Sequence, residues 1–259
     1  VFTDPSLQPL SGLELSGGFS LFRRVNSGLR PRLSFGMTTE TRRYILSEDA
    51  KAINPSARAS DFAYDKIEAH AIMNWKGQAG KPSYLVRLTA GHNRYGGSTL
   101  SNYVRGAGSV RLQPNRNNAY TFSTSVEKQW RQDNDLRSAD IFELGTAWTH
   151  ITKGGNRLDF TVRGSDTRSD SSAIAHDRLR FGVFLSPNKK IIGAVPRLHL
   201  QFEERWYDQA REISVPRRDS QFSAGAALLF SDYQVWGFAP EVGLSIRQNN
   251  SNVSRYETR

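Results

Sequence analysis

The sequence predicts an all-β protein, a transmembrane up-and-down antiparallel β-barrel. Three observations lead to this fold class: apolar and polar residues alternate along many segments, one face of these segments carries charge, and connection lengths tend to alternate. Helical periodicity is nearly missing. No stretch approaches the roughly 18–20 consecutive apolar residues of a membrane helix, so strands are the elements expected to cross the lipid.

The alternation is clearest in Arg157–Arg163, where Leu158, Phe160 and Val162 share one face and polar or charged residues share the other. Side chains of a strand point alternately to opposite faces, so this pattern indicates one apolar and one polar face. The same pattern predicts twelve strands, at about residues 11–22, 29–43, 61–75, 83–94, 102–113, 119–132, 139–151, 157–168, 178–186, 196–208, 219–230 and 238–248.

The composition narrows the class further. Of the 259 residues, 37% are hydrophobic and 11% are aromatic, which is lean for a filled core but too rich in rings for a disordered chain. Cysteine is absent, which excludes a disulfide scaffold, a cysteine zinc site and a thiol nucleophile. The formal charge is +10, but the cations are spread over many strands instead of forming one stripe, so no nucleic-acid partner is expected.

A soluble β-sandwich or lipocalin-like barrel would also show alternating strands. A closed soluble barrel of twelve long strands needs a filled interior, whereas the inward faces here are predicted to be polar and charged. The expected inward residues are Arg32, Lys66, Glu68, His70, Arg87, Arg111, Glu127, Arg131, Glu143, Asp159, Arg163, Arg180, His199, Glu203, Glu241 and Arg247.

Aromatic residues are expected at both ends of the apolar face. Two aromatic girdles that flank an apolar band are typical of a lipid-facing barrel. One girdle is predicted near the tight turns, from Trp75, Tyr84, Trp148 and Trp236, and the other near the longer loops, from Tyr44, Tyr64, Tyr95, Tyr103, Trp130 and Trp206. We therefore expect a multi-pass protein in the outer membrane of a Gram-negative bacterium.

Connections after the odd-numbered strands are mostly tight, and those after the second and tenth strands are longer and polar. Such barrels have short periplasmic turns, longer outside loops and an even number of strands. On this parity one strand is expected before Val1, residues 1–10 belong to the first outside loop, and a thirteenth strand begins after Val253. We therefore expect residues 1–259 to form one barrel domain that has about fourteen strands when complete.

Motifs for chemistry are poor. The histidines are scattered without ligand spacing, and no nucleophile elbow, Walker loop or dinucleotide fingerprint is present. We expect no enzyme activity, no catalytic residue, no cofactor and no metal. The basic surplus has two interpretations: neutralisation of lumen carboxylates and of lipopolysaccharide phosphates, or attraction of anionic cargo. Cations in or beside the outside loops are Arg42, Arg43, Arg137, Arg211, Arg217 and Arg218.

The C-terminal segment carries a more specific pattern. Gly237-Phe238-Ala239-Pro240 precedes an apolar-alternating run, then Asn249-Asn250-Ser251-Asn252, then Tyr256 and Arg259. This order resembles the closing hairpin of surface lipoprotein assembly modifier (Slam) barrels, where G-[FI]-x-P, an alternating run, N-x-S-N, a tyrosine and an arginine follow one another. The match covers about twenty-five residues, and Pro240, Asn250, Ser251, Asn252 and Tyr256 carry it.

The resemblance implies a fourteen-stranded outer-membrane barrel that moves surface lipoproteins, or related small secreted proteins, to the cell exterior. Its members usually carry a periplasmic helical-repeat domain, which this sequence does not show, so that domain is absent, cleaved or outside this chain. A periplasmic helical-repeat domain or a partner chain is accordingly a candidate partner. Two alternatives stay open: a porin-like channel for small anionic solutes or polysaccharide, and a structural barrel subunit of an envelope complex. Outer-membrane lipid and lipopolysaccharide are the other expected partners.

Overall fold

The computed structural model describes residues 12–24, 31–46, 48–53, 55–56, 58–77, 81–132, 135–209, 215–230, 232–233 and 241–253. Twelve strands are found in these ranges: β1 (Gly12–Arg24), β2 (Arg32–Leu46), β3 (Tyr64–Trp75), β4 (Ser83–Tyr95), β5 (Ser98–Leu112), β6 (Asn118–Arg131), β7 (Ala139–Ile151), β8 (Arg157–Ser169), β9 (His176–Ser186), β10 (Val195–Tyr207), β11 (Arg217–Leu229) and β12 (Glu241–Ser251).

Helices are short and lie in the connections. α1 (Glu48–Ile53) and the 3₁₀ helix η2 (Ala59–Phe62) occupy the β2–β3 connection, and η3 (Asp135–Arg137) precedes β7. Among the described residues, no helix is long and apolar enough to cross a membrane.

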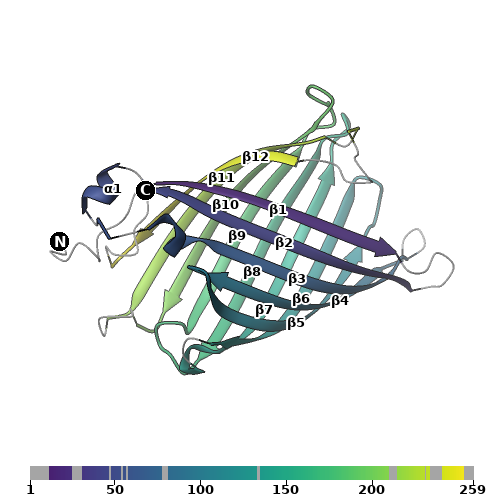
Figure 1. The fold of residues 1–259 in the computed structure, drawn as a ribbon. Coiled ribbons are helices and arrows are strands. Elements are labelled where there is room, and N and C mark those ends of the chain that lie inside the picture. The colour runs from purple at the N-terminus through teal and green to yellow at the C-terminus, as the bar shows by residue number, and fades with distance from the viewer. Residues whose placement is uncertain are drawn as a thin grey trace.

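Each strand pairs antiparallel with the next along the chain, from β1 to β12 in a single sheet. Figure 1 shows the strands following one another round a barrel-like surface. No pairing between β1 and β12 is found in the described part of the chain. The predicted all-β, up-and-down antiparallel architecture is confirmed, and each predicted strand overlaps an observed one.

Two connections depart from the sequence expectations. The β4–β5 connection is a tight turn in which Gly96 and Gly97 have φ of 57° and 81°, so this even-numbered connection is short. Side chains other than glycine rarely adopt this backbone conformation. At the other end of the chain, the hydrogen-bonded ladder of β12 continues to Ser251, beyond residue 248, where the sequence predicted that the strand ends.

The two faces of the sheet differ in chemistry. On the face that we call the outer face, large apolar side chains are strongly exposed, as for Leu88 (58%), Val126 (58%) and Leu144 (54%). The opposite, inner face carries most of the polar and charged residues, and many of them are buried. In β7, for example, Phe142, Leu144 and Trp148 point outward, and Glu143 points inward. An exposed apolar outer face is what lipid contact requires.

Exchanging Phe122 for arginine tests this assignment of faces. Phe122 is exposed on the outer face of β6, whereas Ser125 of the same strand lies on the inner face. An arginine in the lipid-facing band costs about 2–4 kcal/mol, so Phe122→Arg should lower the free energy of unfolding in lipid vesicles by that amount. Ser125→Arg serves as the control. A larger loss for Ser125→Arg than for Phe122→Arg would contradict the assignment.

Candidate functional site

The candidate site is the polar inner face. The strand register places the sequence-predicted inward residues on it together, on each strand from β2 to β10 and on β12. Glu241 and Arg247 belong to β12 by backbone position, but their side chains lie outside the described part. The described inner-face residues from the predicted set are Arg32, Lys66, Glu68, His70, Arg87, Arg111, Glu127, Arg131, Glu143, Asp159, Arg163, Arg180, His199 and Glu203.

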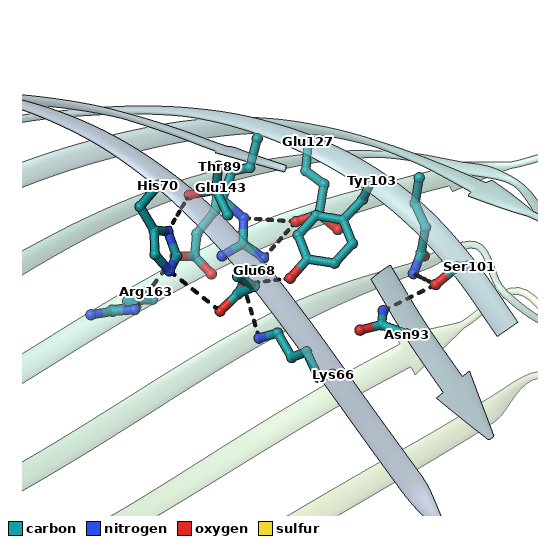
Figure 2. Close-up of polar contacts among 12 residues, drawn as sticks. Lys66, Glu68, His70, Thr89, Asn93, Ser101, Tyr103, Glu127, Glu143 and Arg163 are labelled. Atoms are coloured by element: carbon teal, nitrogen blue, oxygen red, sulfur yellow. Dashed lines mark hydrogen bonds and ion pairs between the residues drawn. The ribbon is translucent and has the colours of Figure 1, made fainter. Parts of the chain in front are cut away.

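A buried polar cluster spans β3 to β6, and Figure 2 shows it. Glu68 is 8% exposed and accepts a hydrogen bond from the Tyr103 hydroxyl. Lys66 Nζ lies 3.0 Å from Glu68 Oε1, and His70 Nε2 lies 3.9 Å from Glu68 Oε2. The other His70 ring nitrogen is 3.1 Å from the Thr89 hydroxyl. A buried carboxylate costs free energy unless it is paired, so these contacts explain why Glu68 is tolerated there.

Tyr103 reaches Glu68 across an intervening strand. In the register, Glu68 of β3 lies opposite Gly91 of β4, and Gly91 lies opposite Tyr103 of β5. The Tyr103 ring covers Gly91 so closely that a Cβ added to Gly91 would meet the ring at 2.2 Å. The glycine therefore provides the space that lets one tyrosine tie three strands together.

Two further contact sets extend this cluster toward the β4–β5 turn and β6. Arg105 pairs with Glu127, with Nη2 and Oε2 2.5 Å apart, and its guanidinium lies 5.7 Å from the Tyr103 ring centroid. Asn93 Nδ2 donates to the fully buried Ser101 hydroxyl at 3.0 Å. All buried side-chain nitrogen and oxygen atoms of the described residues have a hydrogen-bond partner, so the inner face is a satisfied network.

A second cluster, richer in arginine, spans β7 to β11. Glu203 is 5% exposed and lies between Arg180, at 2.5 Å, and Arg205. Glu143 receives Arg178 at 2.8 Å, with Arg163 3.6 Å away. Here each carboxylate has two guanidinium neighbours, which leaves a local excess of positive charge. Arg217 and the 1%-exposed Asp219 pair beside this cluster, and the Arg217 guanidinium stacks over the Tyr207 ring.

Of the ten aromatic residues predicted for the two girdles, five lie on the outer face: Trp75, Tyr84, Trp130, Trp148 and Trp206. Tyr84 and Trp130 are 47% and 45% exposed, and Trp236 lies outside the described residues.

The prediction that Tyr64 and Tyr103 belong to the lipid-facing aromatic girdle near the longer loops is wrong. The Tyr64 hydroxyl donates to Asn93 Oδ1 at 3.1 Å, and Tyr103 is 4% exposed on the inner face. Tyr95 lies directly opposite Tyr64 in the register and so shares the inner face, which makes its girdle prediction wrong as well; the Tyr44 side chain lies outside the described residues. The alternation of side chains along each strand could have shown this. Tyr64 lies two residues from Lys66 and Tyr103 eight residues from Arg111, so each tyrosine shares a face with a residue that was predicted to point inward.

The arginine pairs that were expected beside outside loops divide between the faces. Arg42 turns inward and pairs with Glu40 at 2.6 Å, whereas Arg43 pairs with Asp65 at 2.7 Å on the outer face. In β11, Arg217 turns inward, whereas Arg218 contacts Glu204 at 3.1 Å and lies 5.7 Å from the Trp206 ring centroid. Arg137 lies in η3, and Arg211 is outside the described residues.

In the C-terminal hairpin, Asn252 joins two connections. Its side-chain amide donates to the Pro216 carbonyl at 2.9 Å, and its Oδ1 accepts from the Arg218 amide at 2.7 Å. The Ser251 hydroxyl accepts from the Val253 amide at 3.2 Å, and Asn250 pairs with Ser220 in the ladder. Pro240 and Tyr256 lie outside the described residues. The Asn252 contacts fix the loop end of β12 to β11.

In the part of the chain that the structure describes, no group of three histidine, aspartate or glutamate side chains is arranged to hold a metal ion. Each described carboxylate of the inner face pairs with a cation of its own strand or of a neighbouring strand. The arrangement can offer hydrogen bonds and positive charge to a polar chain or an anion that contacts the inner face.

Gly91→Ala should destabilise the barrel, because the new methyl group must displace the Tyr103 ring and break its bond to Glu68. We expect a loss of about 1–3 kcal/mol, measured from the unfolding midpoint in lipid vesicles. Gly108→Ala is the matched control, since an added Cβ there meets nothing within 4 Å. Equal midpoints for the two variants would show that Tyr103 is not held over Gly91.

A double-mutant cycle isolates the Tyr103–Glu68 bond. Tyr103→Phe removes the donor, Glu68→Gln removes the charge, and the double variant removes both. Buried hydrogen bonds to charged groups contribute about 1.5–3 kcal/mol, so we expect a coupling of that order in unfolding free energy. Additive losses would mean that the two side chains do not interact in the folded protein.

Comparisons with known proteins agree with the pattern in the C-terminal segment. A family model described as surface lipoprotein assembly modifier matches residues 149–259, from late β7 to the end of the chain. No curated protein and no solved structure matches the chain. The matched region contains β8 to β12, and hence most of the arginine-rich cluster. Residues 149–259 are therefore similar to the surface lipoprotein assembly modifier family, and the family resemblance predicted from the C-terminal hairpin is confirmed.

Proposed function

We propose that this chain is the barrel of an outer-membrane translocon that exports surface lipoproteins, or related small secreted proteins, across the outer membrane. The observation that carries the proposal is the family match over residues 149–259, on a sheet with an exposed apolar outer face and a polar inner face. Transport and assembly, not catalysis, is the activity that this family implies.

The inner face supports passage of a polypeptide. An unfolded chain carries unpaired amide and carbonyl groups, which need hydrogen-bond partners wherever water is scarce. Serine, threonine, glutamate and arginine side chains of the inner face supply such partners. The outer face anchors the barrel in lipid, and lipopolysaccharide phosphates would meet Arg43 and Arg218 beside the outside loops.

A porin-like channel for small anionic solutes is the second candidate. The specific observation in its favour is the excess of cations over carboxylates on the inner face, since fixed positive charge in a pore selects anions. The family match does not favour it, because its description names lipoprotein assembly.

Deletion of the gene tests the export function. Cells with and without it should be compared by protease shaving of the surface and by analysis of the medium. We expect one or two lipoproteins or small secreted proteins to disappear from the outside and to accumulate in the periplasm. Complementation with the intact gene is the control. An unchanged surface protein set, together with altered uptake of anionic solutes, would replace export with the channel function.

A further inference from the structure

The charges of the inner face are not evenly paired. Every described inner-face carboxylate has a cation within 4.0 Å: Glu40, Glu68, Glu127, Glu143, Asp159, Glu203 and Asp219. Cations outnumber these carboxylates, so some of them have no carboxylate left to bind. An arginine without a fixed partner on a polar surface is available to an anionic ligand.

Three arginines on the wall formed by β2 to β5 meet this description. The side chains of Arg32, Arg87 and Arg111 form no hydrogen bond or ion pair with any residue that the structure describes. Their inner-face neighbours across the strands are uncharged: Asn74 beside Arg32, Ile72 and Ala107 beside Arg87, and Ser83 and Thr121 beside Arg111. We call these three residues the arginine triangle.

The arginine triangle lies in one half of the barrel. Arg32 begins β2 and Arg111 is the penultimate residue of β5, so both lie near the turns that follow odd-numbered strands. The described carboxylates of this wall, Glu40 and Glu68, lie farther along the strands, toward the other end. On the sequence-derived topology the turns after odd strands are periplasmic, so the triangle faces the side from which exported proteins arrive.

The spacing of the triangle indicates the kind of ligand. Strands lie about 4.8 Å apart and rise about 3.3 Å per residue, which places the three Cα atoms about 12–16 Å from one another. An extended polypeptide covers a similar distance in four or five residues. Acidic residues spaced in this way can meet two or three of the guanidinium groups at once, whereas a single small anion makes fewer contacts.

We infer that the arginine triangle is a docking site for an extended, acidic segment of the protein being exported, at the periplasmic half of the inner face. This inference rests on the proposed export function, because it assumes that a polypeptide enters the barrel. To the export function the inference adds the chemical class of the segment of the exported protein that binds first, which is extended and acidic. Glu68 and Glu127 stay paired with Lys66 and Arg105 and do not compete for the triangle.

Binding of a fluorescent deca-glutamate peptide to the purified full chain in detergent tests the inference without any export step. Arg32→Gln/Arg87→Gln/Arg111→Gln should weaken binding about tenfold at low salt, since each exposed charge pair contributes modestly. Arg43→Gln/Arg168→Gln/Arg218→Gln removes the same charge from the outer face and is the control, expected to bind like the unaltered chain.

Equal weakening by both triple variants would reduce the effect to net charge and overturn the inference. So would unaltered binding by the first variant, or complete displacement of the peptide by phosphate at micromolar concentration, which would define a small-anion site. None of these results bears on whether export occurs, which the gene deletion decides. Retained peptide binding in a chain whose deletion leaves the surface proteins unchanged would instead overturn the export function alone.

Discussion

Hydrogen bonding between the backbones of neighbouring strands is the constraint on which the rest of the structure depends. In a lipid environment each amide and carbonyl must be satisfied within the protein, and the ladder from β1 to β12 does this wherever two described strands are neighbours. The ladder also fixes the register. Because side chains alternate, the register then divides every strand into an outer apolar row and an inner polar row.

The inner row illustrates how charged side chains are accommodated once the ladder has placed them there. Glu68 and Glu203 are nearly buried. Lys66 of the same strand and Tyr103 of β5 hold Glu68, and Arg205 of the same strand and Arg180 of β9 hold Glu203. Breaking such a pair leaves an unpaired buried charge, which costs more than the pair contributes. The clusters therefore act mainly on the conformation of the inner face, by holding side chains in fixed positions against its wall. The arginine triangle has no such side-chain contact with a described residue, which leaves its guanidinium groups available to an acidic ligand.

Much of this arrangement could be predicted from the sequence, because alternation is a local property. The strands and the inward positions of residues such as Glu127 and Arg163 follow from counting by two along each segment. The placement of Tyr103 did not follow from its position near a strand end, where aromatic residues usually meet the membrane interface. Its inward orientation follows the same alternation, but its contact with Glu68 over Gly91 joins residues of three strands, and cross-strand contacts cannot be read from one segment alone. Likewise, Arg217 was expected beside a loop, whereas it lies on the inner face of β11, where it pairs with Asp219.

The central claim is that one face of the sheet is a water-accessible, cationic surface and the other contacts lipid. The chain has no cysteine, so single cysteines introduced along β8 report on each position without background. The rate of labelling should be measured in vesicles with an anionic and a cationic thiol reagent, both membrane-impermeant. Positions 159, 161 and 163 should react, faster with the anionic reagent, and positions 158, 160 and 162 should not. Uniform labelling, or faster labelling by the cationic reagent at the inner positions, would contradict the account.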